Sequence, residues 1–259
     1  MALLAVDVGN AHTVLGIVAA GDVSAHWRVS TDQRRTADEW AVLLRGLVGR
    51  HLGEIDGIVL CSTVPGVTQA GREMLARHFA HLDHLVVEPG VRTGIPVLTD
   101  NPREVGTDRI VNSLAAATTY GGPAIVVDFG GTATTFDVVN AAGKYVGGAI
   151  APGIEISLEA LGRRGAQLRQ VELTRPRSVI AKNTVEALQS GLVFGVAAQV
   201  EGIVARIITE LDVPVENVSV ISTGYLASLV VDECDCFTDH APWLTLCGLE
   251  LIFVRNYRK

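Results

Sequence analysis

Two stretches of the chain share one pattern of apolar and polar residues. Residues 3–18 read LLAVDVGNAHTVLGIV, and residues 125–139 read IVVDFGGTATTFDVV. In each, an apolar run ends in an Asp-x-Gly turn, polar residues that include threonine follow, and a second apolar run begins. This predicts a strand, a tight glycine turn and a second strand in both places. Because Asp7 and Asp128 lie about half of the chain apart, we interpret the two hairpins as products of a duplication.

The remaining pattern alternates strands and helices within each half. For the first half we expect strands at 23–31, 55–63 and 84–90, and helices at 36–52, 64–79 and 108–119. For the second half we expect a strand at 145–153, a helix at 154–168, one long helix or two joined helices at 182–211, and a strand, glycine turn and helix start at 217–230. This order predicts two α/β domains, 1–120 and 121–259, each with a mixed sheet flanked by helices.

Composition and charge narrow the possible partners. The 259 residues are 48% hydrophobic and 19% charged, which is typical of a well-packed globular protein. The net charge of −7 argues against a nucleic-acid partner or an anionic membrane surface. No apolar run reaches the roughly 18–20 residues that span a bilayer, and the N-terminus lacks the basic region of a signal peptide. We therefore expect a cytoplasmic protein with no membrane partner. The Cys234–Cys236 pair is either ordinary cysteine or a metal or redox pair.

The two hairpins carry the chemistry of phosphate binding. A carboxylate at the end of a strand, as at Asp7 and Asp128, can hold a cation or a water that bridges phosphate oxygens. Glycine lets the backbone N–H groups of the turn approach phosphate closely. Neither a G-x-G-x-x-G after the first strand nor a G-x-x-x-x-G-K-[ST] loop is present, which argues against a Rossmann or P-loop protein. A plain hairpin remains the alternative for each copy, but the repetition favours two turns that hold a triphosphate.

A third group of polar residues precedes the predicted helix 108–119. Gly106, Thr107, Asp108 and Arg109 form either an N-cap with a salt-bridging arginine, or a general base beside a guanidinium that can bind carboxylate or phosphate. The glycine loop at 147–153 could form a pocket wall. Lys182, Asn183 and Thr184 lie near a helix start, where capping is the simpler interpretation.

Taken together, five ordered segments resemble the type III pantothenate kinases, members of the acetate kinase/sugar kinase/Hsp70/actin superfamily. The segments are DVGNAHTVLGIV, DNPREVGTDRIVNSLAA, VVDFGGTATTFDVV, GGAIAPGI and RPRSVIAKNTVEALQSGLVFG, and the ending PWLTLCGLELIFVRN is also similar. The resemblance implies an α/β fold of duplicated actin-like (ribonuclease H-like) domains with an ATP cleft between them. It also implies transfer of the γ-phosphoryl group of ATP to the primary hydroxyl of pantothenate, the first step towards coenzyme A.

The resemblance also implies roles for particular residues. Asp108 would be the catalytic base. The substrate site would comprise Gly106, Thr107, Asp108, Arg109 and Thr184. ATP would contact Asp7, Val8, Gly9, Asn10, Ala11, His12, Thr13, Val14 and Thr132. Asp128 would bind a monovalent cation, K⁺ or NH₄⁺; Mg²⁺ is expected with ATP, and a homodimer is expected.

Four positions depart from the family's pattern. Ala11 replaces a hydroxyl residue, Gly130–Gly131 adds a glycine, Thr99 stands where a tyrosine is usual, and Tyr225 stands where a second glycine is common. A one-residue insertion would turn later side chains to the other face unless the turn absorbs it, and glycine permits this, so we expect the strand after Thr132 to stay in register. The alternatives are a member that has lost catalysis and binds ligand for regulation, a kinase for another hydroxyl compound, or a phosphatase of the superfamily.

Overall fold

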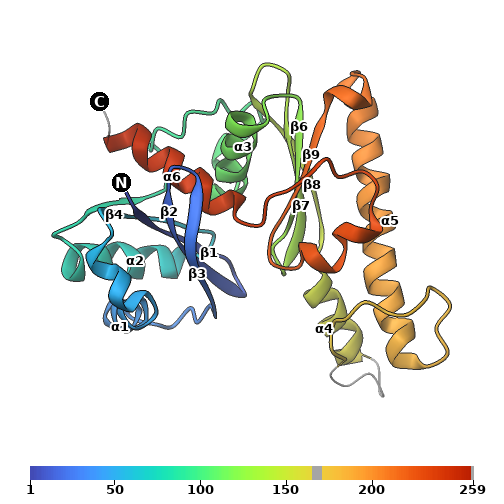
Figure 1. Cartoon of the computed structure of the whole chain (residues 1–259), viewed down its shortest axis with the longest axis horizontal. Coiled ribbons are helices and arrows are strands. Elements are labelled where there is room, and N and C mark those ends of the chain that lie inside the picture. The colour runs from blue at the N-terminus through green and yellow to red at the C-terminus, as the bar shows by residue number, and fades with distance from the viewer. Residues whose placement is uncertain (165–170, 258–259) are drawn as a thin grey trace. The chain divides into compact units, whose positions relative to one another are not determined.

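The chain forms two compact units in a computed structural model that describes residues 1–164 and 171–257 (Figure 1). One unit is Met1–Ala115 together with the C-terminal segment from Trp243, and the other is Ala116–Pro242. This division differs from the predicted domains 1–120 and 121–259, because helix α6 (Leu244–Tyr257) packs on the first sheet. The side chains of Leu246 and Phe253 lie against Gly16 and Gly57 of that sheet.

The first unit is built on a five-stranded mixed sheet of order β3-β2-β1-β4-β5. Its strands are β1 (Leu3–Val8), β2 (His12–Ala19), β3 (Asp22–Ser30), β4 (Gly57–Ser62) and β5 (Asp83–Val86). Its helices are α1 (Ala37–Val48), α2 (Pro65–His78), α6 and α3 (Thr107–Thr119), whose last turn enters the second unit. Figure 1 shows α1 and α2 on one face of the sheet and α6 on the other, so both faces are covered.

The second unit repeats this sheet in the order β10-β9-β6-β7-β8. Its strands are β6 (Ala124–Phe129), β7 (Ala133–Val139), β8 (Tyr145–Pro152), β9 (Ser219–Thr223) and β10 (Asp239–His240), and its helices are α4 (Ile154–Arg164) and α5 (Thr184–Leu211). Short 3₁₀ segments lie at Gly49–Gly53, Pro102–Glu104, Val215–Asn217, Ala227–Leu229 and Val231–Glu233. The predicted pair of mixed sheets flanked by helices is confirmed.

The two hairpins match residue for residue. Asp7 pairs with Val14 in the first, and Asp128 pairs with Thr135 in the second, so the turns are equally long. The added glycine therefore does not shift strand β7, and the predicted register is confirmed. Gly131 itself has a φ of 96°, a conformation that favours glycine.

Several predicted elements differ from the structure in detail. The region 182–211 contains one helix, α5, rather than two. The helix expected after the Gly224 turn is replaced by the short 3₁₀ segments, and α6 and β10 were not predicted. The capping box at the start of α1 is present, since Thr36 accepts from the backbone N–H of Glu39 and the Glu39 carboxylate accepts from the N–H of Thr36. The end of the predicted helix 154–168 lies outside the described residues.

Helix α5 is apolar as well as long. With 28 residues and a mean hydropathy of 1.6 over its most apolar window, it could cross a membrane by length and composition, whereas no such segment was expected. The core helix of a water-soluble protein meets the same criteria. Leu192, Val196, Val200 and Val204 of α5 belong to the core of the second unit, so the structure gives this helix a packing role.

A buried carboxylate on α6 holds the turn between β2 and β3. Glu250 is only 7% exposed, and its two carboxylate oxygens accept from the backbone N–H groups of Ala20 (2.7 Å) and Gly21 (2.8 Å). We expect Glu250→Ala to lower the free energy of unfolding by about 1.5–3 kcal/mol, because two backbone donors lose a charged acceptor that is itself buried. Urea unfolding measures this, with the exposed Glu73→Ala as control; equal midpoints for the two variants would contradict the role.

Candidate active site

The first hairpin makes a tight turn at the end of β1. The backbone N–H of Gly9 donates to the carbonyl of His12 (2.9 Å), and a Cβ at Gly9 would lie 3.1 Å from that oxygen. Asn10 is exposed at the tip, while Thr13 is fully buried with its hydroxyl 2.8 Å from that of Thr31. The Thr13 hydroxyl is therefore hydrogen-bonded inside the unit, to Thr31. The polar groups at the tip of the turn are the backbone groups and the side chain of Asn10.

Asp7 and Asp108 are neighbours of one buried thiol. The Cys61 Sγ donates to Asp7 Oδ1 at 3.2 Å, because β1 and β4 are parallel and Asp7 pairs with Cys61. Burial raises the pKa of Cys61 far above its ordinary value, and the negative charges of Asp7 and Asp108 raise this pKa further. The first unit thus brings Asp7, predicted to lie in a phosphate-binding turn, and Asp108, the predicted base, to the same edge of the sheet.

The base candidate Asp108 lies in the first turn of α3. Its Oδ1 is buried without a hydrogen-bond partner, and it lies 2.5 Å from the position that a Cβ would take on Gly106. Burial raises the pKa of Asp108 above 3.8, while the backbone N–H and the positive charge of Arg109 lower it. A partly desolvated carboxylate of this kind is suited to accept a proton. A side chain at position 106 would force this carboxylate oxygen to move.

Residues around this turn fix its position. The hydroxyl of Thr107 donates to the carbonyl of Ser62 at the end of β4 (3.4 Å), and the backbone N–H of Ile110 donates to the carbonyl of Gly106 (3.2 Å). No sequence motif marked Cys61 or Ser62 as part of a site. The sequence offered one indication that they lie near the site: both residues are at the end of a strand predicted to precede a helix. The carboxyl ends of parallel strands gather at one edge of a sheet, where sites are commonly found.

The second hairpin is built around close backbone approaches. A Cβ at Gly224 would lie 2.5 Å from Asp128 Oδ1, so this carboxylate occupies the space that a side chain would fill. The hydroxyl of Tyr225 lies beside Gly131 and donates to Glu155 Oε2. The carbonyl of Thr132 accepts from the N–H of Gly153 (3.0 Å). The segment 147–153, expected to be a glycine loop, is mostly part of strand β8, and this bond ties the end of that strand to the turn. Asp128 and Thr132 therefore belong to one compact turn.

Thr184 is the remaining residue predicted to bind the substrate. Thr184 is the exposed first residue of α5, and Asn183 caps that helix by accepting from the N–H of Glu186 (2.9 Å).

Within residues 1–164 and 171–257, no group of three or more His, Cys, Asp or Glu side chains could hold a metal ion. A cation at Asp128 would therefore need backbone carbonyl or water oxygens besides this carboxylate, which is the donor chemistry that alkali ions accept.

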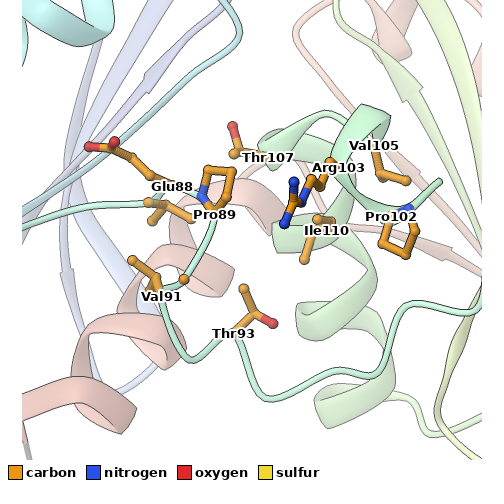
Figure 2. A pocket seen from close by; sticks show the side chains of 11 residues that line it. Glu88, Pro89, Val91, Thr93, Pro102, Arg103, Val105, Thr107 and Ile110 are labelled. Atoms are coloured by element: carbon orange, nitrogen blue, oxygen red, sulfur yellow. The ribbon is translucent and has the colours of Figure 1, made fainter.

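A pocket of about 720 Å³ lies on the first unit, beside the start of α3 (Figure 2). One wall is the loop that follows β5, and the other is the segment leading into α3. The lining residues are Val87, Glu88, Pro89, Gly90, Val91, Thr93, Pro102, Arg103, Val105, Thr107 and Ile110. Thr107 belongs to both the pocket and the Gly106–Arg109 turn.

Two five-stranded mixed sheets of one strand order, each opening with an Asp-Gly hairpin, define an actin-like protein. The fold is similar to that of the activator of the 2-hydroxyisocaproyl-CoA dehydratase from Clostridium difficile, solved with bound ADPNP. That match has a TM-score of 0.57 and 12% identity, and it covers 99% of this chain and 96% of the other.

The model of the type III pantothenate kinase family matches residues 3–206. Proteins with that name from Nocardioides sp. (strain ATCC BAA-499 / JS614) and Streptomyces avermitilis are 73% and 59% identical. The alignments cover 99% and 98% of this chain and 100% and 98% of those proteins. The chain therefore belongs to the type III pantothenate kinase family.

Proposed function

We propose that this protein transfers the γ-phosphoryl group of ATP to the primary hydroxyl of pantothenate, giving 4′-phosphopantothenate and ADP, the first step of coenzyme A biosynthesis. The observation that carries the proposal is Asp108, a carboxylate with a raised pKa and a buried Oδ1 at the start of α3, in a chain of this family. The intact Asp108 and Arg109 disfavour a member that has lost catalysis.

In the proposed reaction, Asp108 accepts the hydroxyl proton as the hydroxyl oxygen attacks the γ-phosphorus. The bond from that phosphorus to the bridging oxygen of ADP breaks, and ADP leaves. Phosphoryl transfer depends mainly on positioning and on stabilisation of charge, so the protein needs a fixed base and fixed phosphate contacts. The buried position of Asp108 over Gly106 supplies a fixed base.

The proposal assigns the nucleotide to the two hairpins. Residues 7–14 and Thr132 would contact ATP, and Asp7 would orient water around the Mg²⁺ that accompanies the phosphates. Ala11 provides no hydroxyl, so one charge-assisted hydrogen bond, worth about 1.5–3 kcal/mol, is missing unless the backbone replaces it. Asp128 fits a monovalent cation, K⁺ or NH₄⁺, because its carboxylate lies among backbone groups of a glycine turn.

The acceptor is assigned to the turn at the start of α3. Gly106, Thr107 and Arg109 would bind pantothenate, together with Thr184. The proposal further includes a homodimer and a cytoplasmic location, in keeping with a metabolic kinase; sedimentation of the purified protein tests the dimer.

The test is a coupled ADP-release assay with ATP, Mg²⁺ and pantothenate, with and without K⁺. Pantothenate-dependent turnover supports the kinase, and stimulation by K⁺ that is lost in Asp128→Asn supports the cation site. A folded protein that binds pantothenate but releases no ADP under any cation would overturn the proposal in favour of a regulatory binding protein. Turnover with other hydroxyl compounds alone would change the acceptor.

The raised pKa of Asp108 predicts a pH dependence. The base acts only when deprotonated, so kcat/KM for pantothenate should fall as the pH is lowered through the pKa of Asp108, and this fall should begin above the ordinary value of 3.8. A profile of kcat/KM between about pH 5 and 8 measures this fall, because proteins are usually most stable in that range. The stability of the enzyme is checked at each pH. A profile of the same shape in the residual activity of Asp108→Asn would assign the titration to another group.

A further inference from the structure

Cys234 and Cys236 lie in a turn of the second unit, between the 3₁₀ segment Val231–Glu233 and strand β10. Both cysteines are half-buried free thiols, and Asp235 between them is exposed. The two thiols are hydrogen-bonded to each other. A pair of neighbouring thiols that solvent can reach is either a metal site, a redox site or ordinary packing, and the surroundings decide between these interpretations.

The surroundings do not supply the ligands of a metal site. Zinc sites in proteins use more ligands than a single pair of cysteines provides. Among the side chains that the structure describes, those around this turn included, no group of three or more His, Cys, Asp or Glu could hold a metal ion. The metal interpretation of the C-x-C pair is therefore disfavoured, and its thiol chemistry is the feature to explain.

The turn is held in a conformation that keeps the two sulfur atoms close. The backbone N–H of Asp235 donates to Oε1 of Glu201 on α5 (3.0 Å). Phe237, which follows Cys236, packs edge-on against Phe129 of β6, with the ring centroids 6.3 Å apart. The turn is thus fixed at its middle and at its end. Two reacting groups that are already held together react much faster than two that must first meet.

The environment of the two thiols is unequal. The Cys234 Sγ also donates to the carbonyl oxygen of Ala197, at 3.8 Å. The hydrogen bond with Cys236, together with burial, raises the pKa of Cys234. The same hydrogen bond lowers the pKa of Cys236, although burial and the negative charge of Glu201 act against this change. Cys236 is therefore the thiol that more readily forms the thiolate, which is the form that attacks a disulfide.

The other two cysteines have oxygen atoms as their partners. The Cys61 thiol is buried and donates to Asp7, and the Cys247 thiol donates to the carbonyl of Gly21 (3.4 Å). Burial raises the pKa of Cys247, and the negative charge of Glu250 raises it further. Cys247 is half-buried like the C-x-C pair, so it provides an internal comparison for thiol reactivity.

We propose that Cys234 and Cys236 form a redox site that reacts reversibly with low-molecular-weight disulfides, with Cys236 as the attacking thiol and Cys234 as the resolving thiol. The proposal does not depend on the proposed kinase activity. A disulfide that closes a ring over one intervening residue, in a turn that solvent reaches, is strained and easily reduced, which makes the reaction reversible.

The reaction has two exchange steps. The Cys236 thiolate attacks one sulfur of the small disulfide, whose S–S bond breaks, and the first small thiolate leaves with the electron pair and takes up a proton. Cys234 then loses its proton and attacks the Cys236 sulfur of the mixed disulfide, and the second small thiol leaves in the same way. The protein dithiol is thereby oxidised to a disulfide, and the small disulfide is reduced to two thiols.

The test exposes the reduced full-length protein to an excess of oxidised glutathione, blocks the remaining thiols with N-ethylmaleimide and maps all four cysteines by mass spectrometry. We expect the loss of two free thiols, a disulfide between Cys234 and Cys236, and full recovery of both thiols with dithiothreitol. Cys247→Ser is the matched control and should react as the wild type does.

The serine variants of the pair test the two roles. Cys234→Ser keeps a hydroxyl donor beside Cys236 and should stop at the first step, with one glutathione bound to Cys236. Cys236→Ser removes the attacking thiol, so Cys234 should stay free under the same conditions. Circular dichroism of each variant checks that the fold is kept.

The wild-type result decides the redox site, even if a serine variant fails to fold. Retention of all four free thiols, a glutathione adduct that persists without ring closure, or a disulfide formed through Cys61 or Cys247 would overturn the proposal. A glutathione adduct that forms on Cys234 in Cys236→Ser as fast as on Cys236 in Cys234→Ser would overturn the assignment of the attacking thiol.

Discussion

Replacing Asp108 with asparagine should lower pantothenate-dependent ADP release by about 10²- to 10⁴-fold, the contribution typical of a positioned general base. The amide has nearly the shape of the carboxylate and can occupy the space over Gly106, but it cannot accept the hydroxyl proton. The loss should therefore appear in kcat, with smaller changes in the KM values of ATP and pantothenate. Steady-state kinetics of both substrates measures the separation.

The same substitution should leave the protein at least as stable as the wild type. Burial raises the pKa of Asp108, so between 3.8 and the raised value the folded state binds more protons than the unfolded chain. The stability contributed by this group is then present at low pH and declines as the pH rises through that window. At a pH above the raised pKa of Asp108, ionisation of the buried carboxylate costs free energy, and the neutral amide of asparagine removes this cost. Thermal unfolding at neutral pH should show an equal or higher Tm.

The exposed Asp83→Asn serves as a matched control, because it makes the same chemical change on β5 in the same unit. It should keep full turnover. Retention of wild-type kcat by Asp108→Asn would remove this residue from the chemistry, whereas a lower Tm together with lost activity would indicate damage to the fold.

The hairpins show how far local sequence determines this fold. The Asp-x-Gly turn between apolar runs predicted both of them. The register after Thr132 was predicted because glycine lets the turn absorb the added residue, and in the structure Phe136 and Val138 are buried as this register requires. The turn at Gly106–Arg109 was likewise predicted from local residue types at a helix start.

Contacts between distant segments were beyond such a prediction. Helix α6 joins the first unit because Gly16 and Gly57 leave room for Leu246 and Phe253, and this fit depends on strands far away in the sequence. Cys61 reaches Asp7 only through the parallel pairing of β4 with β1. In the wall of the pocket, the side chain of Asn256 on α6 hydrogen-bonds to the backbone of Arg92, and no local pattern links these two residues.

Gly153→Ala should disrupt the second hairpin more than its one added methyl group suggests. The new Cβ would overlap the carbonyl oxygen of Gly131 and lie 2.7 Å from its carbonyl carbon and 2.8 Å from that of Thr132. These are backbone atoms, so the whole turn must move, and overpacking of this kind costs about 1–3 kcal/mol of stability. The hydrogen bond from Gly153 N–H to Thr132 would also be distorted.

If Thr132 contacts ATP and Asp128 binds a monovalent cation, as proposed, displacement of this turn should raise the KM for ATP at least about tenfold, the equivalent of about 1.4 kcal/mol of binding. The KM for pantothenate should change less, because most of its proposed contacts, those at Gly106–Arg109, lie in the other unit. Gly46→Ala, at an exposed position of α1 with nothing within 4 Å of the new Cβ, should be neutral or slightly stabilising. An unchanged ATP KM in a destabilised Gly153→Ala protein would separate the turn from nucleotide binding and restrict the phosphate contacts to the first hairpin.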